Sequence, residues 1–363
     1  MSTDAAVVVG VVVALLLVAG LFAAVAVRGR RWADSAAPAE PEPFAPDPDA
    51  RPRAAVVVNP TKFDGGTDDM RRQVEVACAE AGWATPLWLE TTEDDPGVGQ
   101  TRQALADGVD VVVACGGDGT VRTVGETLAG TGTPLGLLPA GTGNLLARNL
   151  DTDVTDVPRS MRIALTGRSR PVDVGWVTVV GPHGEEHTRP EEQAFLVMAG
   201  MGFDAAIMAN APEALKAKVG PIAYAISGLR QLRGQQARVR LQVDDEVVTR
   251  RVRTVVVGNC GRLLGGLVLM PDAEVDDGWL DVVTISPKGV VGWAAVAGRV
   301  ITRRRRGHPR VEHWRARELS IRAETPQPAQ LDGDPVGDAV ELRMRVDPGA
   351  LLVRVPDAAE GQP

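Results

Sequence analysis

The chain has 363 residues, of which 44% are hydrophobic and 24% charged, and its net charge is −8. This length is enough for about two globular domains. The acidic balance gives no support for nucleic acid as a partner. Three widely spaced cysteines (Cys78, Cys115 and Cys260) form neither a disulfide framework nor a metal-ligand pattern.

The N-terminus predicts a membrane anchor. The 23 residues Ala5–Val27 carry no charge and are long enough to cross a bilayer core of about 30 Å. Arg28, Arg30 and Arg31 follow at once, so the positive-inside rule places the N-terminus outside and the rest in the cytoplasm. A cleaved signal peptide is the alternative, but the run is too long and its basic flank lies on the wrong side. We expect a single-pass protein of the cell membrane, with a transmembrane helix within residues 1–32 and a disordered linker over 33–52.

Residues 53–170 predict a doubly wound α/β domain, in which strands and helices alternate. Ala54–Val58 is a continuous apolar run, typical of a strand buried in a parallel sheet. Thr67 is expected to cap the helix that follows. Further strands are expected over Thr85–Glu90, Val111–Cys115 and Leu135–Leu138, and helices over Gly97–Ala106, Val121–Leu128, Leu145–Leu150 and Pro158–Leu165.

Two glycine-rich turns follow successive strands of this domain. The first turn is Gly116-Gly117-Asp118-Gly119-Thr120, and the second is Gly141-Thr142-Gly143-Asn144. Such turns, at one edge of a parallel sheet and ahead of helices, offer backbone N–H groups and the helix dipole to an anion. Asp118 is the unusual residue, because a carboxylate beside phosphates requires a cation between them. One such turn alone is often only a tight turn, but the pair predicts a nucleoside triphosphate site that works with Mg²⁺.

Residues 171–336 predict a second, mostly antiparallel β domain. A helix is expected over Ile222–Leu232, and Asp244-Asp245 is expected to form a hairpin turn. The β-like segments are Val172–Val180, Ala194–Met198, Ala237–Val243, Glu246–Val257 and Trp279–Ile285.

The chain resembles the diacylglycerol kinase catalytic domain family, which includes bacterial lipid kinases and sphingosine kinases. The resemblance rests on the first glycine turn and on Leu138-Pro-Ala-Gly-Thr-Gly-Asn144 with the following Ala147-Arg148. NAD kinases and phosphofructokinases share the first turn, but the second turn is similar to that of the lipid kinases. The resemblance covers about Arg53–Pro356. It implies an ATP cleft between the domains, final strands of about 337–356 that complete the first domain, and a tail over 357–363.

The resemblance also implies which residues hold ATP. Besides the two glycine turns, these are Asn59, Pro60 and Thr61 of an Asn-Pro loop, and Thr92. The loop is longer here than in the family. Lys62 in that loop either reaches a phosphate or is a solvated lysine.

Substrate and metal roles follow from the same resemblance. Asp173 belongs to an Asp-x-Gly strand near the cleft, and Asp173 and Arg148 are assigned to the substrate. Asp277, with the carbonyl oxygens of Glu274 and Trp279, is assigned to a structural Mg²⁺, and Asp118 to the metal beside ATP. Two more matching segments are Ala199–Ala205 and Lys216–Tyr224.

Asp334 is the expected catalytic base. Phosphoryl transfer to an alcohol needs a base near the hydroxyl. The family has Asp-Gly-Glu where this chain has Asp332-Gly333-Asp334, so the carboxylate is shorter by one methylene, or about 1 Å of reach. An acidic turn ahead of a strand is the structural alternative.

Two further positions depart from the family pattern. Leu145 stands where the family often has Asp, and Arg122-Thr123 stands where many members have Asn-Glu. A carboxylate near the metal is therefore missing at both places. Glu126, one turn further along, is a candidate to replace it, and Arg122 a candidate to contact a phosphate.

The sequence thus predicts a membrane-bound, ATP-dependent lipid kinase, with diacylglycerol as the default acceptor and phosphatidic acid as its product. An NAD kinase-like enzyme and a catalytically impaired nucleotide- or lipid-binding protein are the alternatives. Arg303–Arg306 is either a patch that faces an anionic leaflet or a solvated helix end. The acceptor lipid and the oligomeric state, a homodimer included, stay open.

Overall fold

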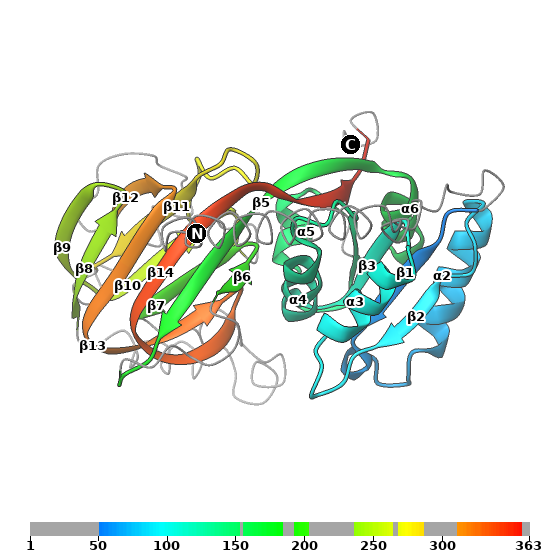
Figure 1. Ribbon diagram of the computed structural model, residues 1–363, viewed down its shortest axis with the longest axis horizontal. Coiled ribbons are helices and arrows are strands. Elements are labelled where there is room, and N and C mark those ends of the chain that lie inside the picture. The colour runs from blue at the N-terminus through cyan, green and yellow to red at the C-terminus, as the bar shows by residue number, and fades with distance from the viewer. Residues whose placement is uncertain are drawn as a thin grey trace, which may run out of the picture. The chain divides into compact units, whose positions relative to one another are not determined.

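One continuous network of hydrogen-bonded strands runs through the protein. The computed structural model describes residues 51–152, 155–183, 192–202, 236–263, 268–286 and 311–357, which lie within one compact unit spanning Arg51–Pro363 (Figure 1). The predicted membrane anchor and nearly all of the predicted linker precede these residues, and the predicted helix Ile222–Leu232 also lies outside them. Among the residues that are described, no helix has the length and apolarity to cross a bilayer.

The first lobe is an α/β structure, which confirms that part of the predicted fold class. Its parallel strands lie in the order β2, β1, β3, β4. The strands are β1 (Ala54–Val58), β2 (Leu87–Glu90), β3 (Val111–Gly116) and β4 (Leu135–Pro139). The helices are α2 (Asp68–Glu80), α3 (Val98–Ala106), α4 (Asp118–Leu128), α5 (Leu145–Asn149) and α6 (Val157–Thr166), with a 3₁₀ turn η1 (Pro60–Lys62).

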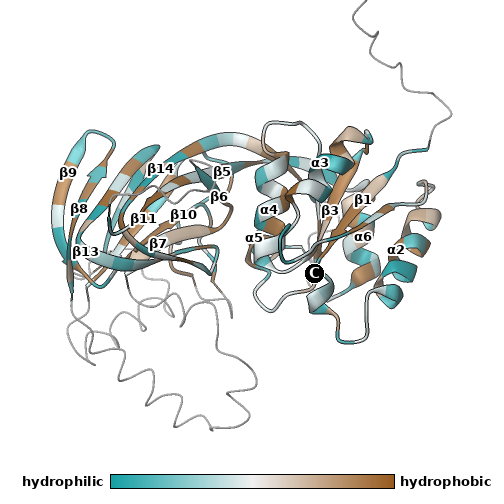
Figure 2. Ribbon diagram, turned by 60° about the horizontal axis from the view of Figure 1, so that its bottom comes forward, coloured by the Kyte–Doolittle hydropathy of each residue, from teal (hydrophilic) through white to brown (hydrophobic). Residues whose placement is uncertain are grey.

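Burial on both faces explains why β1 reads as an unbroken apolar run. Ala54, Val56 and Val58 pack in the cluster that contains Val74 of α2 and Met161 of α6. The alternate residues, Ala55 and Val57, pack on the opposite face in the cluster that contains α3 and α4 residues. In Figure 2 the neighbouring strand β3 is correspondingly brown along its length. Such double coverage is the mark of a doubly wound sheet.

Thr67 does not cap α2 in the expected way. It occupies the position before the helix, but no hydrogen bond joins its side chain to the amides of the first turn. Its hydroxyl donates instead to Oε1 of Glu90, at 2.7 Å, and so ties the start of α2 to the end of β2. Asp68 and Asp69 in the first turn still provide negative charge at the positive end of the helix dipole.

The second lobe is built from antiparallel pairs, as predicted. Asp244 has φ 47° in the turn between β8 and β9, where the sequence predicts a hairpin. The single predicted segment Glu246–Val257 is two strands, because the amide of Arg253 leaves that ladder and donates to the carbonyl of Ile285. The strands are β5 (Arg168–Val180), β6 (Gln193–Phe195), β7 (Met198–Gly202), β8 (Ala237–Val243), β9 (Glu246–Val252), β10 (Thr254–Gly258), β11 (Leu280–Ile285), β12 (Val311–Ala316), β13 (Glu318–Leu331) and β14 (Asp334–Val355).

Two long strands belong to both lobes. β5 and β14 pair antiparallel from Glu341 opposite Val180 to Val355 opposite Arg168, with a break in register between Asp347 and Leu351. Near its end β14 also pairs in parallel with β4, with Val353 opposite Leu135. Figure 1 shows the two strands side by side as they pass from one lobe to the other. The C-terminal residues therefore extend the sheet of the first lobe.

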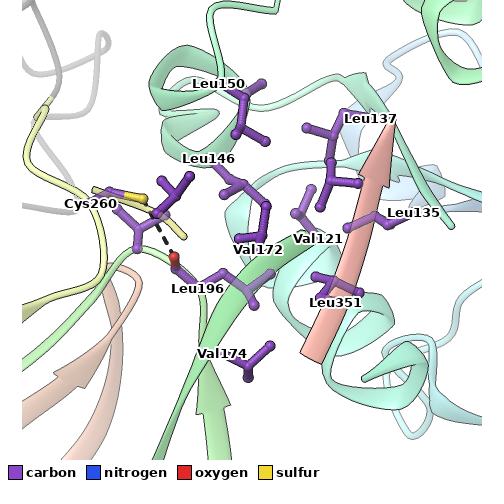
Figure 3. Packing of buried hydrophobic residues seen from close by; sticks show 14 of the residues in the cluster. Val121, Leu135, Leu137, Leu146, Leu150, Val172, Val174, Leu196, Cys260 and Leu351 are labelled. Atoms are coloured by element: carbon purple, nitrogen blue, oxygen red, sulfur yellow. Dashed lines mark hydrogen bonds between the residues drawn. The ribbon is translucent and has the colours of Figure 1, made fainter. Parts of the chain in front are cut away.

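A shared hydrophobic core fills the junction behind the glycine turns. Val121 of α4 and Leu146 of α5 pack in one cluster with Val172 of β5 and Leu351 of β14 (Figure 3). Leu196 belongs to the same cluster, and its carbonyl lies 3.6 Å from Sγ of Cys260. The helices that carry the glycine turns are thus packed directly against second-lobe strands.

Candidate functional site

A cleft of about 840 Å³ lies where the carboxyl ends of the parallel strands meet the turn between β13 and β14. Ligands bind at this edge in open α/β folds. The first lobe contributes the loops after β1, β2, β3 and β4, and the second lobe contributes one hairpin turn. The lining residues are Asn59, Pro60, Thr61, Lys62, Thr91, Thr92, Glu93, Pro96, Gly117, Asp118, Gly119, Thr120, Arg122, Thr123, Gly141, Thr142, Gly143, Leu145, Asp332, Gly333, Asp334 and Pro335.

The first glycine turn presents the N-terminus of α4 to the cleft. The helix begins at Asp118, with Gly117 as the residue before it. The first amides of a helix have no carbonyl partner within it, so they are available to an anion. Gly116 is required because a β-carbon there would collide with the side chain of Thr120. The turn can therefore bring bare backbone against a phosphate group.

The second glycine turn is closed by its own asparagine. Asn144 has φ 49°, and its side chain both accepts from the amide of Gly141 at 3.1 Å and donates to the carbonyl of Gly141 at 2.7 Å. A β-carbon on Gly141 would lie 2.6 Å from Cα of Gly117. The two turns predicted to act together are in direct contact.

Asp118 joins these turns through its carboxylate. Oδ2 accepts from the amide of Asn144 at 2.9 Å, and Oδ1 accepts from the amide of Leu145 at 2.6 Å. Burial raises the pKa of this carboxyl, the two amides lower it, and the nearby charge of Asp334 raises it further. Its first role is therefore to hold the second turn at the N-terminus of α5, a contact that the sequence pattern does not reveal.

The Asn-Pro loop lies beside the first turn. Oδ1 of Asn59 accepts from the amide of Thr61 at 3.1 Å and from its hydroxyl at 2.7 Å, while the amide of Asn59 donates to the carbonyl of Cys115. Cε of Lys62 lies 3.7 Å from the position of a β-carbon on Gly117. Lys62 therefore extends over the first glycine turn. Thr92 also lines the cleft, as the resemblance implies.

Asp334 lies at the start of β14, against the first turn of α4. Nη2 of Arg122, on α4, donates to Oδ2 of Asp334 at 2.9 Å. A β-carbon on Gly119 would lie 2.8 Å from the same oxygen. The proposed base is thus held directly over the first glycine turn. The sequence gives no signal for this contact, because the two residues are 212 positions apart.

Asp332 fixes the turn that carries Asp334. Its carboxylate is almost fully buried and accepts from three consecutive amides, those of Leu196, Val197 and Met198, at 2.8–2.9 Å. Burial raises the pKa of Asp332 to about 6, against the opposing effects of these amides and of Arg122. Asp332 also has φ 49°, a conformation that aspartate adopts more readily than most residues. The first Asp of the Asp-Gly-Asp sequence is therefore structural.

The two residues assigned to the substrate, Asp173 and Arg148, are not part of the cleft lining. Asp173 is 1% exposed, and its carboxylate accepts from the amides of Gly278 at 2.6 Å and Gly349 at 2.8 Å. Burial raises its pKa. Nε of Arg148 donates to the carbonyl of Gly143 at 2.8 Å. Neither side chain lines the described cleft, so Asp173 stabilises a strand junction and Arg148 stabilises the second glycine turn.

Glu126 does not supply the missing carboxylate. It accepts from the amide of Ala194 at 3.0 Å and is not part of the cleft lining. Burial raises its pKa, while the amide and the charge of Arg122 lower it. Glu126 therefore connects α4 to β6.

The guanidinium of Arg315 lies in the region assigned to a structural Mg²⁺. Arg315 forms an ion pair with Oδ2 of Asp277, and Oδ1 of Asp277 accepts from the amide of Trp279 at 3.0 Å. Arg315 also lies 3.6 Å from Oδ2 of Asp281, and 5.6 Å from the ring centre of Trp279. Since the guanidinium already neutralises Asp277, this carboxylate with the carbonyls of Glu274 and Trp279 fits a structural metal poorly.

The cleft itself fits a metal that arrives with phosphates. Across the ranges described, no three His, Cys, Asp or Glu side chains gather into a metal site. Asp118 and Asp334 both line the cleft, and the charge of Asp334 disfavours ionisation of Asp118. A cation between them would relieve this repulsion. Mg²⁺ commonly takes only one or two carboxylates and completes its shell with substrate phosphates and water.

Several predicted features fall outside the described residues. These are Phe203, Asp204 and Ala205 of the Gly-Phe-Asp segment, the segment Lys216–Tyr224, and the Arg303–Arg306 run.

Comparisons with known proteins give the same assignment for both lobes. Residues 53–177 match the family model "Diacylglycerol kinase catalytic domain", and residues 197–355 match "YegS C-terminal NAD kinase beta sandwich-like domain". A protein of Pseudomonas aeruginosa named "Probable lipid kinase YegS-like" is 33% identical over 295 residues, covering 80% of this chain and 91% of the relative. A protein named "Diacylglycerol kinase" from Staphylococcus saprophyticus is 27% identical over 294 residues, covering 78% of this chain and 89% of the relative.

A solved structure supports the fold. The crystal structure of a diacylglycerol kinase from Bacillus anthracis superimposes with a TM-score of 0.66 at 23% identity, covering 85% of this chain and 98% of that one. The two glycine turns, the Asp-Gly-Asp hairpin and these matches lead to one conclusion. The chain belongs to the diacylglycerol kinase family of lipid kinases, which are phosphotransferases.

Proposed function

We propose that this protein transfers the γ-phosphate of ATP to the hydroxyl of a membrane lipid, with diacylglycerol as the first candidate acceptor and phosphatidic acid as its product. The observation that carries the proposal is the position of Asp334. Its carboxylate is 51% exposed in the cleft and lies over Gly119 at the N-terminus of α4. A base and an anion-binding turn therefore face the same space.

ATP binding is assigned to the first lobe. The free amides at the start of α4 and the ammonium of Lys62 favour the phosphates. The residues proposed to bind ATP are Asn59, Pro60, Thr61, Thr92, Gly116, Gly117, Asp118, Gly119, Thr120, Gly141, Thr142, Gly143 and Asn144. Among them, Gly116 and Asn144 act by shaping the turns, since neither lines the cleft.

Asp334 is the proposed base. It accepts the proton of the lipid hydroxyl as that oxygen forms a bond to the γ-phosphorus, and the bond from the γ-phosphorus to the bridging oxygen of ADP breaks. General-base catalysis of this kind contributes about 10²–10⁴ in rate. Asp118, with Asp334 close by, would hold Mg²⁺ at the phosphates. When bound, Mg²⁺ neutralises charge on the phosphates.

The test is a transfer assay with labelled ATP, Mg²⁺ and a total lipid extract of the source cells, followed by separation of the lipids. A labelled lipid is the expected result, and its identity names the acceptor. Asp334→Asn should abolish nearly all transfer and still bind ATP. Label on added NAD with none on any lipid would overturn the proposal, and so would ATP binding with no transfer to any acceptor.

We also propose that Ala5–Val27 attaches the enzyme to the cell membrane, with the kinase lobes on the cytoplasmic side. The support is the length of the apolar run and the arginines that follow it. Membrane fractions should retain the full chain after a carbonate wash and release a variant that lacks residues 1–50. A full chain found in the wash supernatant would contradict the assignment.

A further inference from the structure

The ion pair between Arg122 and Asp334 joins two positions at which the sequence departs from its family. The family pattern has Asn and Glu at these positions, and this chain has Arg and Asp. In the structure the two side chains meet, with 2.9 Å between Nη2 of Arg122 and Oδ2 of Asp334. On α4, Arg122 is longer than the asparagine of the family pattern, and on the hairpin Asp334 is shorter than the glutamate.

Arg122 is a poorly solvated cation that needs a partner. Its side chain is 15% exposed, and its buried Nε has no hydrogen-bond acceptor within the described ranges. Burying an unpaired guanidinium is costly. Two other carboxylates, Glu126 and Asp332, are near enough for their ionisation to respond to Arg122, but they accept hydrogen bonds from backbone amides. The carboxylate that Arg122 contacts directly is that of Asp334, whose side chain is 51% exposed in the cleft.

The pair distinguishes the two oxygens of Asp334. Oδ2 accepts the hydrogen bond from Arg122 and lies 2.8 Å from the position of a β-carbon on Gly119. Oδ1 lies 3.9 Å from that position. The carboxylate is therefore fixed through Oδ2, and Oδ1 is the oxygen left to accept a proton from a bound hydroxyl.

A glutamate at position 334 would not fit beside Arg122 in this way. One extra methylene would carry the carboxylate by about 1 Å, toward the backbone at Gly119 or past the guanidinium. Conversely, an asparagine at position 122 is too short to hold the carboxylate of Asp334. Each residue suits the other, and neither suits the family residue at the opposite position.

We propose that Arg122 is a positioning residue for the base, which holds Oδ2 of Asp334 so that Oδ1 faces the bound hydroxyl. The inference rests on the proposed function, in which Asp334 accepts the proton. Arg122 acts by holding Oδ2, so its loss should lower kcat and leave the ATP site at the glycine turns intact.

The test is a double-mutant cycle in the transfer assay on the full-length protein. Arg122→Asn and Asp334→Glu alone should each lower kcat about 10- to 100-fold, with KM for ATP changed less than about 2-fold. The double variant carries the family residues at both positions and should exceed the product of the single effects by at least about 10-fold. Recovery on adding a second substitution is a result that simple loss of structure does not give.

Arg250→Asn is the matched control. Arg250 also donates to a carboxylate at 2.9 Å, that of Glu312, and both side chains are partly exposed and outside the cleft lining. It should keep wild-type kcat. If Arg122→Asn fails to fold, Arg122→Lys with and without Asp334→Glu measures the same coupling.

The outcomes separate the two proposals. Wild-type transfer together with single effects that multiply in the double variant would overturn the role of Arg122 and leave the kinase intact. Unchanged kcat in Arg122→Asn would do the same. A wild-type protein that binds ATP and transfers no phosphoryl group would overturn the proposed function itself, and this inference with it.

Discussion

Gly117 and Gly141 lie so close together that a β-carbon on Gly141 would be 2.6 Å from Cα of Gly117. Real β-carbons essentially never approach backbone this closely, so a residue other than glycine at position 141 would push the two turns apart. The contact explains why two turns separated by a whole helix and strand act as one surface.

Gly141→Ala is therefore expected to weaken ATP binding by at least about 10-fold, because the added methyl group pushes the second turn away from the first. Calorimetric titration with a non-hydrolysable ATP analogue measures the change. Gly65→Ala is the matched control, since a methyl group there meets open space. Wild-type affinity in Gly141→Ala would show that the contact does not shape the site.

Asp118→Ala should lower both stability and ATP affinity. The carboxylate accepts from the amides of Asn144 and Leu145, and removing it should cost about 1–3 kcal/mol in the free energy of unfolding. Asp156→Ala provides the comparison, because Asp156 likewise accepts from an amide of the first turn of α6 but lies outside the cleft. Urea unfolding should show a loss in both variants. ATP titration should show a loss in Asp118→Ala alone.

Lys62→Met should raise KM for ATP about 10-fold and leave kcat nearly unchanged. The lysine extends over Gly117, where it can meet a phosphate in substrate and transition state alike, and one charged hydrogen bond is worth about 1.5–3 kcal/mol. Lys62→Arg keeps the charge and should stay within about 3-fold of wild type. Equal KM values in Lys62→Met and wild type would indicate a solvated lysine.

Asp281 should make the protein less stable as pH rises from about 4 to about 6. Burial raises the pKa of Asp281 to about 6, with Arg315 opposing and Asp277 and Asp272 adding to the shift. The folded state then binds more protons than the unfolded state, so this contribution is complete below the unfolded pKa and is lost through the folded one. Asp281→Asn should remove about 1–3 kcal/mol of this pH dependence. The measurement is urea unfolding at several pH values, and equal slopes for both proteins would contradict it.

Chelation of Mg²⁺ should leave the thermal stability of the wild type almost unchanged. Arg315 already neutralises Asp277, so Tm with and without Mg²⁺ should agree within about 2 °C. Arg315→Gln removes the cation, and its Tm should rise when Mg²⁺ is added. A wild-type Tm that falls by more than about 5 °C on chelation would support a structural metal instead.

The sequence was sufficient for the order of the first-lobe elements and for the loops that line the cleft. Burial on both faces of β1 and β3 leaves an apolar run that is legible without a structure, and glycine turns after strands mark the ligand edge of the sheet. These features depend on local composition and on the rule that ligands bind at the carboxyl ends of parallel strands. The positions of these strands and loops in the fold can therefore be predicted from the sequence.

Contacts between distant residues could not be read in the same way. Arg122 and Asp334 meet only because the turn between β13 and β14 lies against the start of α4. Asp173 was assigned to the cleft from its motif, yet it is buried and its carboxylate accepts from two backbone amides. Asp332 lines the cleft, but its carboxylate likewise accepts hydrogen bonds from backbone amides. An acidic residue in a glycine-rich motif has the same pattern whether its carboxylate serves a ligand or a turn.

The strands shared by the two lobes determine how the cleft can move. Two lobes joined by a flexible linker can rotate freely about it. Here β5 and β14 cross the junction as a ribbon of two hydrogen-bonded strands. Motion must bend that ribbon, and the natural flexing point is the break in register between Asp347 and Leu351. Gly349 lies in this break with φ 63°, and its amide is held by Asp173. The buried carboxylate of Asp173 therefore holds the backbone at the point where this ribbon would bend.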